Sequence, residues 1–184
     1  MAEPPPGDEN PTRYARRLAL AKARLVAQKI RAGWVLGADT VVVLNGKIYG
    51  KPVDYSDACR ILSRLQGSTH RVITGVAFVH AETGRTKVGH AVSRVTMRPM
   101  SAPHVRRYAR RHQDKAGAYA VQEKKDPVVL KIRGSYTNVV GLPMELVRKL
   151  FGDELGQDSP YARRPGESAR SNRRPRSPAL RNKR

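Results

Sequence analysis

A run of small and apolar residues with one carboxylate near its start constrains the fold of this chain more than any other stretch. The run covers residues 37–44, and it is followed by Asn45-Gly46 and a second β-prone run over residues 47–52. Both central residues of a type I′ turn need positive φ, which Asn and Gly tolerate, so the pattern predicts a β-hairpin. Leu44 should then lie opposite Lys47.

The same register can be continued away from the turn. It would place Thr40 opposite Lys51 and Asp39 opposite Pro52. A strict ladder points Asp39 and Lys51 to opposite faces of the sheet, but a bulge at Gly50 would turn Lys51 toward Asp39. Two interpretations stay open. Asp39 and Lys51 share a site, or Asp39 ends a buried strand and Lys51 is solvated.

Charge and composition narrow the class of protein. The 184 residues carry a formal charge of +21, which favours polyanions such as nucleic acid, nucleotides or acidic membrane surfaces. Nine basic residues against two acidic ones follow residue 157, yet the rest of the chain is basic as well. There is no apolar run long enough to span a membrane, no visible secretory signal and a single cysteine, Cys59. These features favour a cytoplasmic protein with no membrane partner.

Helix and strand periodicities predict a chain that mixes both kinds of element. Asn10-Pro11 is typical of a helix start, and this helix should run to about Arg31. Its buried stripe should consist of Tyr14, Leu18, Ala21 and Leu25. Further helices are expected over residues 54–66, 101–111 and 144–151, and further strands over 72–79, 88–97, 118–122 and 128–132. The strands over 72–79 and 88–97 should form an antiparallel pair.

Two features allow both a functional and a structural interpretation. Lys22 lies beside the predicted stripe, where it can extend into an adjoining cleft or remain a solvated surface lysine. Residues 134–143 combine glycines, hydroxyls and an amide, which suit hydrogen bonds to a ligand but are equally typical of a turn before a helix. The residue types alone leave both questions open.

Four side chains would suit phosphoryl chemistry. Such chemistry needs a carboxylate that holds a divalent ion or accepts a proton, and cations that bind phosphate oxygens. Asp39 would supply the carboxylate, Lys22 and Lys51 the cations, and Gln122 an amide that can donate and accept at a base edge. The sequence has no Gly-rich loop ending in Gly-Lys-Ser or Gly-Lys-Thr, which disfavours a P-loop NTPase.

Several sequence blocks carry a family resemblance that extends over about residues 8–151. They are Gly37-Ala38-Asp39-Thr40-Val41-Val42, Gly50-Lys51-Pro52, Thr74-Gly75-Val76, Lys115-Ala116-Gly117-Ala118-Tyr119, Val121-Gln122 and Ser135-Tyr136-Thr137-Asn138-Val139-Val140-Gly141-Leu142-Pro143. In order and spacing these blocks resemble the Maf-like nucleoside triphosphate pyrophosphatases, also called septum-formation inhibitor proteins. The resemblance implies hydrolysis of a nucleoside triphosphate to the monophosphate and pyrophosphate, in the cytoplasm. The Ala-Tyr-x-x-Gln and Ser-Tyr-x-Asn forms are similar to the branch that acts on dTTP and UTP.

The resemblance also implies roles for individual residues. Asp39 takes the place of the family's proton acceptor, and Thr40 and Gln122 fall at positions associated with substrate choice. Lys22 and Lys51 match lysines on the phosphate side. Asp39 and Glu3 match positions that hold a divalent metal ion, Mg or Mn.

The fold implied by the resemblance is α/β, with a mixed twisted sheet flanked by helices, like that of the inosine triphosphate pyrophosphatases. Residues 1–152 would form one Maf-like domain, and residues 153–184 a disordered Arg-rich tail. The family normally begins with a strand and a Ser-x-Ser-Pro-Arg-Arg loop, and this sequence starts after the point where they should end. We therefore expect either a longer natural protein or a weakened relative. Glu123 and Asp126-Pro127 also replace small, Gly-rich positions of the family.

A second class of function stays open beside the enzyme. A basic protein could use a Maf-like core as a platform while its Arg-rich tail contacts nucleic acid or another polyanion. Nonspecific nucleic-acid contact through the tail is compatible with the enzyme as well. A homodimer is an open alternative that the sequence does not decide.

Overall fold

A computed structural model describes residues 9–122 and 127–155, which are built around a five-stranded sheet. Its strands lie in the order β2-β1-β3-β4-β5, and all four neighbouring pairs are antiparallel. The strands are β1 (Trp34–Leu44), β2 (Lys47–Tyr49), β3 (Thr69–His80), β4 (Thr86–Met97) and β5 (Val129–Arg133). The α/β class with a helix-flanked sheet is thus confirmed, although the described strands form no parallel pair.

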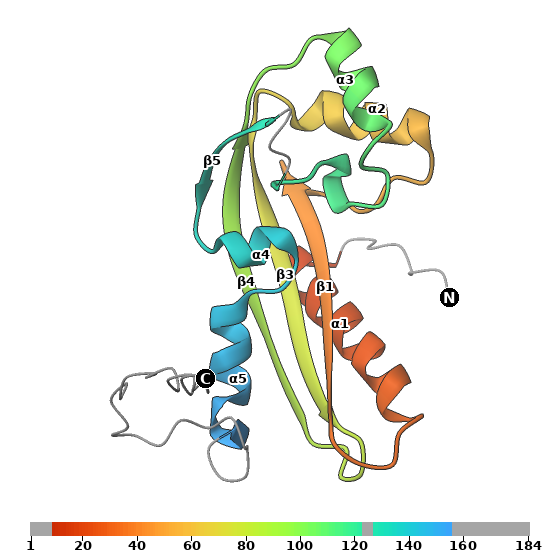
Figure 1. Cartoon of the computed structure of the whole chain (residues 1–184), viewed down its shortest axis with the longest axis vertical. Helices are drawn as coiled ribbons and strands as arrows, with labels where there is room; N and C mark the ends of the chain where they lie inside the picture. Colours follow the sequence, from red (N-terminus) through yellow and green to blue (C-terminus); the bar gives the residue numbers. More distant parts are fainter. Residues whose placement is uncertain (1–8, 123–126, 156–184) are drawn as a thin grey trace, which may run out of the picture.

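Helices cover both faces of this sheet (Figure 1). Helix α1 (Pro11–Ala27) lies along one face, and the short α4 (Tyr136–Val140) and α5 (Met144–Leu155) lie along the other. Phe151 of α5 stacks on Phe78 of β3 with ring centroids 4.8 Å apart. Helices α2 (Tyr55–Leu65) and α3 (Ala102–Ala109) and the 3₁₀ turn η1 (Ala116–Ala118) pack against one end of the sheet.

The predicted hairpin forms with the predicted register. Val42, Val43 and Leu44 pair with Tyr49, Ile48 and Lys47, and Asn45 and Gly46 both have positive φ. The continuation of that ladder is wrong, because β2 ends at Tyr49 and the chain leaves the sheet at Gly50. Lys51 therefore lies outside the strand, so the alternation of side chains along the ladder does not apply to it. No bulge at Gly50 is required to change its direction.

Helix α1 packs on the sheet through its smallest side chains. Ala15, Ala19, Ala23 and Ala27 are buried at four-residue spacing, together with Tyr14 and Leu18. A Cβ added to Gly37 of β1 would overlap the carbonyl of Ala19, and one added to Gly75 of β3 would overlap that of Ala15. The predicted stripe was wrong at Ala21 and Leu25, which are exposed, because close backbone approach favours the alanine face over the larger side chains.

One predicted strand is absent from the described residues, and the outer limits of three helices differ. Residues 118–122 form no strand: Gly117 and Ala118 have positive φ and turn the chain in and out of η1. Helix α1 ends at Ala27 instead of about Arg31, and α3 at Ala109 instead of 111. Helix α5 runs to Leu155 instead of residue 151, so it includes residues 153–155 of the segment predicted to be a disordered tail. Helix α2 and the β3–β4 pair lie where the periodicity predicts them. Glu3, residues 123–126 and residues 156–184 lie outside the described residues.

No helix of the described residues has the length and apolar character that crossing a membrane requires.

Candidate active site

A pocket of about 350 Å³ opens at the edge of β1, just beyond the end of β2. Strand β2 covers this edge only at Val42, Val43 and Leu44, and the sheet order gives residues 34–41 no other neighbour on that side among the described strands. Asp39 and Thr40 point to opposite faces of the sheet, as successive residues of a strand must. Both line the pocket, which therefore wraps around the open edge of β1 and reaches both faces.

Five of the six predicted site residues line this one pocket. They come from four parts of the chain: Lys22 from α1, Asp39 and Thr40 from β1, Lys51 after β2, and Gln122 after η1. Glu3 lies outside the described residues. The sequence therefore found residues that the fold brings together, while their chemical roles stay predictions.

Asp39 and Lys22 form an ion pair across the interface between β1 and α1. Lys22 Nζ donates to Asp39 Oδ1 at 2.5 Å. Asp39 is 8% exposed, while the Lys22 side chain remains 43% exposed. Of the two interpretations of Lys22, a side chain that extends into a cleft or a solvated surface lysine, the structure supports the first. Its ammonium reaches the pocket and holds the carboxylate in a fixed orientation. The side chain is still partly exposed, so a ligand in the pocket can contact it.

Thr40 lies on the other face and belongs to a hydrogen-bonded network. Its Oγ1 is 2.9 Å from Oγ1 of Thr74, which donates to the carbonyl of Asn138 at 3.1 Å. The fully buried Asn138 in turn donates from Nδ2 to the carbonyl of Val72 and to Ser93 Oγ, at 3.1 and 2.9 Å. This network fixes α4 to the sheet and so places Val139 and Val140 at the pocket wall.

The polar residues of the 134–143 loop have mainly structural partners. Ser135 Oγ accepts from the amide of Asn138 at the start of α4, and Thr137 Oγ1 accepts from the amide of Met144 at the start of α5. Both hydroxyls also donate to Glu145, at 2.9 and 3.0 Å. These contacts cap two helices, which favours the turn interpretation of this loop.

The segment that carries Gln122 is anchored to the rest of the pocket at two points. The amide of Gly117 donates to the carbonyl of Gly50 at 3.0 Å, directly beside Lys51. Tyr119 lines the pocket, and its hydroxyl is 2.8 Å from Nε2 of the buried His70. Gly117 can approach this closely because it has no Cβ, which would lie 3.0 Å from atoms of Val42 and Tyr119. Its φ is also positive, a conformation that glycine adopts readily.

Burial keeps both members of the His70–Tyr119 pair neutral. It lowers the pKa of His70 from 6.5 to about 4, and it raises the pKa of Tyr119 well above its usual value. At neutral pH the pair is therefore an imidazole and a phenol joined by one hydrogen bond. Tyr119 therefore does not suit the role of a general base at neutral pH.

Comparison with known sequences decides the family. The sequence model of the Maf-like protein family matches residues 1–154. This chain belongs to that family. Three similar Maf-like relatives are named dTTP/UTP pyrophosphatase. The protein from Elusimicrobium minutum is 42% identical over 143 residues, which are 78% of this chain and 78% of the relative.

The other two relatives give the same level of similarity. The protein from Pelotomaculum thermopropionicum is 43% identical over 144 residues, or 77% of this chain and 75% of the relative. The protein from Geobacter sulfurreducens is 44% identical over 151 residues, or 80% of this chain and 78% of the relative. The family resemblance of the sequence blocks is thus confirmed.

The carboxylates of this Maf-like chain fit a metal ion that is held partly by substrate. Within residues 9–122 and 127–155, no three His, Cys, Asp or Glu side chains come together as a metal site. Of the two described carboxylates that line the pocket, Asp39 is buried, whereas Asp114 is exposed and already bonded to Lys115. Magnesium is often held by one or two carboxylates together with substrate phosphates and water. The donor set suits that mode of binding and does not suit a site made of protein ligands alone.

Sequence reasoning missed His70, and it gave Tyr119, Lys115 and Asp114 no role at the site. Asp114, Lys115 and Tyr119 line the pocket, and Lys115 Nζ donates to Asp114 at 2.5 Å. That bond lowers the pKa of the Asp114 carboxyl. The block Lys115–Tyr119 was visible in the sequence, but no local pattern connects Tyr119 to His70, which is 49 positions away.

The stability of this Maf-like chain should fall as pH is lowered from about 6.5 to about 4, because of His70. In that window the unfolded chain binds a proton at His70 and the folded chain does not, so acid favours unfolding. The loss should reach about 3 kcal/mol near pH 4 and vanish above pH 6.5. Thermal unfolding of the wild type and of His70→Gln at several pH values measures it.

His90→Gln is the matched control for this experiment. Its pKa is also lowered, first by burial and then by Arg16, but His90 is exposed in the folded chain, so its removal should change the pH dependence less. A His70→Gln protein whose melting temperature follows pH as steeply as the wild type would contradict the burial argument.

Proposed function

We propose that this Maf-like chain hydrolyses nucleoside triphosphates, with dTTP and UTP preferred, to the nucleoside monophosphate and pyrophosphate. The observation that carries the proposal is the convergence of Asp39, Lys22 and Lys51, from three different elements, on one pocket that also receives Gln122. The names and coverage of the relatives support the same activity. We further propose that residues 1–152 act as one domain in the cytoplasm.

Lys22 and Lys51 bind the phosphates in this proposal. They line the same pocket as Asp39 and come from two different elements, α1 and the segment after β2, so a triphosphate bound there would meet positive charge from both. Lys22 Nζ donates to Asp39, and the Lys22 side chain is 43% exposed where it lines the pocket. It can therefore hold the carboxylate and contact a phosphate oxygen together.

Asp39 accepts the proton from the attacking water. Its carboxylate is held by Lys22, lies at the pocket wall and is largely removed from solvent, which are the conditions for a positioned base. With Glu3, Asp39 also holds the divalent ion, Mg or Mn. When bound, that ion neutralises phosphate charge and lowers the pKa of water.

Base selection is assigned to Gln122 and Thr40 in this proposal. Gln122 can donate to and accept from a base edge, and Thr40 presents a hydroxyl whose position is fixed by Thr74. Val139 and Val140 supply apolar surface for the ring. An amide recognises a pattern of donors and acceptors, whereas Lys22 and Lys51 contact groups that all nucleotides share.

Replacement of Gln122 by alanine should change the ratio of kcat/KM values among dTTP, UTP, CTP and GTP. The preferred substrates should lose about tenfold or more relative to the others, since a base that was hydrogen-bonded loses its partner. Steady-state release of pyrophosphate from each nucleotide measures the ratio.

Lys51→Ala is the control for that measurement. It should slow hydrolysis of all four nucleotides by a similar factor and leave their ratio unchanged, because its contacts are with phosphate. An unchanged ratio in Gln122→Ala would remove Gln122 from base recognition. The nucleic-acid-binding role of the tail and a homodimer stay predictions beside this proposal.

A further inference from the structure

A second cavity lies between the β1–β2 hairpin and α2, and four of the eleven residues that line it are basic. Its volume is about 470 Å³. The hairpin and the segment after it contribute one wall, and α2 contributes the other. The charged residues that line it are Lys47, Lys51, Asp57, Arg60 and Arg64.

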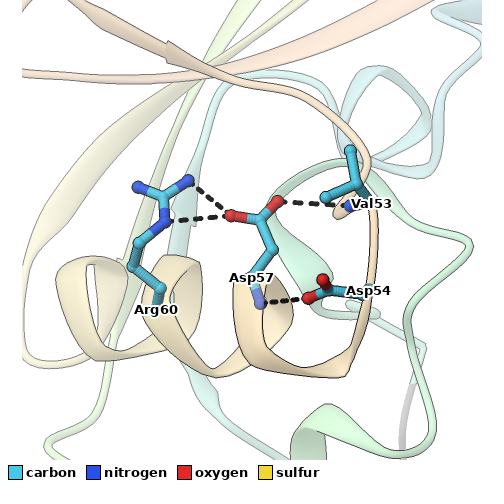
Figure 2. A network of polar contacts seen from close by, with 4 residues as sticks. All are labelled: Val53, Asp54, Asp57 and Arg60. Carbon is cyan, nitrogen blue, oxygen red and sulfur yellow. Dashed lines mark hydrogen bonds and ion pairs between the residues drawn. The ribbon is translucent and has the colours of Figure 1, made fainter.

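The single carboxylate of this cavity is already neutralised. Asp57 Oδ1 accepts from Arg60 Nη2 and Nε at 2.5 and 2.9 Å, and Oδ2 accepts from the amide of Val53 at 3.2 Å (Figure 2). Both carboxylate oxygens therefore have partners. Asp54 is used separately, because its Oδ1 accepts from the amide of Asp57 and caps α2.

Three cations of the cavity have no such compensation. For Lys47, Lys51 and Arg64, no ion pair with a carboxylate is recorded within the described parts of the chain. Arg60 and Arg64 are four residues apart on α2, so they project from the same side of the helix. Like charges gathered in a concave surface repel one another, and an anion that enters removes this repulsion.

The cavity also adjoins the candidate active site. Ile48, Gly50 and Lys51 line both hollows. Lys51 therefore stands between the place proposed for the triphosphate and the group formed by Lys47, Arg60 and Arg64. An anion released from the first hollow meets further positive charge in the second.

We propose that this second cavity is a binding site for a free phosphate-type anion, pyrophosphate or orthophosphate, next to the active site. The lining is basic and polar, with little apolar wall to hold a base or an acyl chain, so it suits a compact anion of high charge. The assignment of pyrophosphate as the natural ligand rests on the proposed function. Binding of the anion rests only on the charges of the cavity.

The test is a double variant, Lys47→Gln with Arg64→Gln, in the full chain. These two residues line the second cavity and not the first. Lys29→Gln with Arg31→Gln removes the same charge from exposed positions after α1 and is the matched control. Isothermal titration with pyrophosphate, orthophosphate and, for comparison, sulfate measures binding to each protein.

The wild type and the Lys29/Arg31 control should bind pyrophosphate in two events, one of which is weakened about tenfold or more in the Lys47/Arg64 variant. Orthophosphate should show the same loss if the site recognises any phosphate, and only pyrophosphate should show it if the two-phosphate anion is required. Equal binding by the three proteins would overturn the proposal. So would equal losses for sulfate and phosphate.

Kinetics give an independent readout. Inhibition of dTTP hydrolysis by added pyrophosphate should be weaker in the Lys47/Arg64 variant, while kcat/KM for dTTP at zero pyrophosphate stays as in the wild type. Unchanged inhibition would overturn the assignment of pyrophosphate as the natural ligand of the second cavity. If dTTP is not hydrolysed by any of the proteins but the titration shows the loss, the anion site stands and the proposed function fails.

Discussion

Replacement of Asp39 by asparagine should lower the turnover of dTTP about 100-fold or more while the fold is retained. Asparagine has nearly the same shape and keeps an oxygen that can accept from Lys22, whose Nζ lies 2.5 Å from the carboxylate. What is lost is the negative charge that accepts a proton or helps to hold a divalent ion. Turnover is measured as pyrophosphate release, and the fold by thermal unfolding of the same preparation.

Asp114→Asn tests whether the loss of turnover depends on Asp39 itself or follows the removal of any carboxylate in the pocket. Asp114 lines the same pocket, but its side chain is 68% exposed and is bonded to its neighbour Lys115. We expect its removal to change turnover by less than about fivefold, because an exposed ion pair contributes little and Asp114 has no role in the proposed reaction. Asp39→Asn protein that is folded and nearly as active as the wild type would make Asp39 a structural residue at the open edge of β1.

Gly75→Ala should destabilise the chain by about 3 kcal/mol or more, a large share of the stability of an ordinary domain. The added methyl group would overlap the carbonyl of Ala15 and crowd the amide of Arg16. Both are backbone atoms of α1, so no flexible side chain can move aside. Helix α1 would have to shift away from the sheet and would separate Lys22 from Asp39. Denaturant unfolding measures the change in free energy.

Gly50→Ala is the control for this prediction. No heavy atom lies within 4 Å of the added Cβ at Gly50, and its φ is not positive. The substitution should change the free energy of unfolding by less than about 0.5 kcal/mol. A stable Gly75→Ala protein that keeps its activity would mean that α1 does not approach the sheet as closely as Ala15 and Gly75 require.

Local signals predicted the elements that position the site. Asn45-Gly46 sets the hairpin register, because few other residue pairs accept its backbone angles. Asn10 and Asp54 accept from the amides of Thr12 and Asp57 at the starts of α1 and α2, as capping residues do. These interactions join residues close in sequence, so they can be predicted before the fold is known.

Features that depend on distant contacts could not be predicted in this way. Apolar periodicity placed Ala21 and Leu25 in the interface of α1, yet Gly37 and Gly75 admit only the alanine face. The strand interpretation of residues 118–122 failed for a similar reason. Gly117 pairs with the carbonyl of Gly50, and Tyr119 turns inward to His70, instead of extending along a neighbouring strand.

The pocket itself depends on where β2 stops. A longer hairpin would have covered the edge of β1 and separated Asp39 from Lys51 on opposite faces of the sheet. The end of β2 at Tyr49 leaves that edge open to the pocket, so residues from both faces line it. Sequence spacing brought Asp39 and Lys51 near each other but gave no indication of this arrangement.

The most direct test of the central claim is the identity of the products that the full chain forms from dTTP in the presence of magnesium. Phosphorus NMR distinguishes pyrophosphate from orthophosphate and the monophosphate from the diphosphate in a single sample. We expect dTMP and pyrophosphate to appear in equal amounts, at a rate that Asp39→Asn lowers about 100-fold or more. Formation of dTDP and orthophosphate, or no turnover above that of the Asp39→Asn protein, would contradict the account.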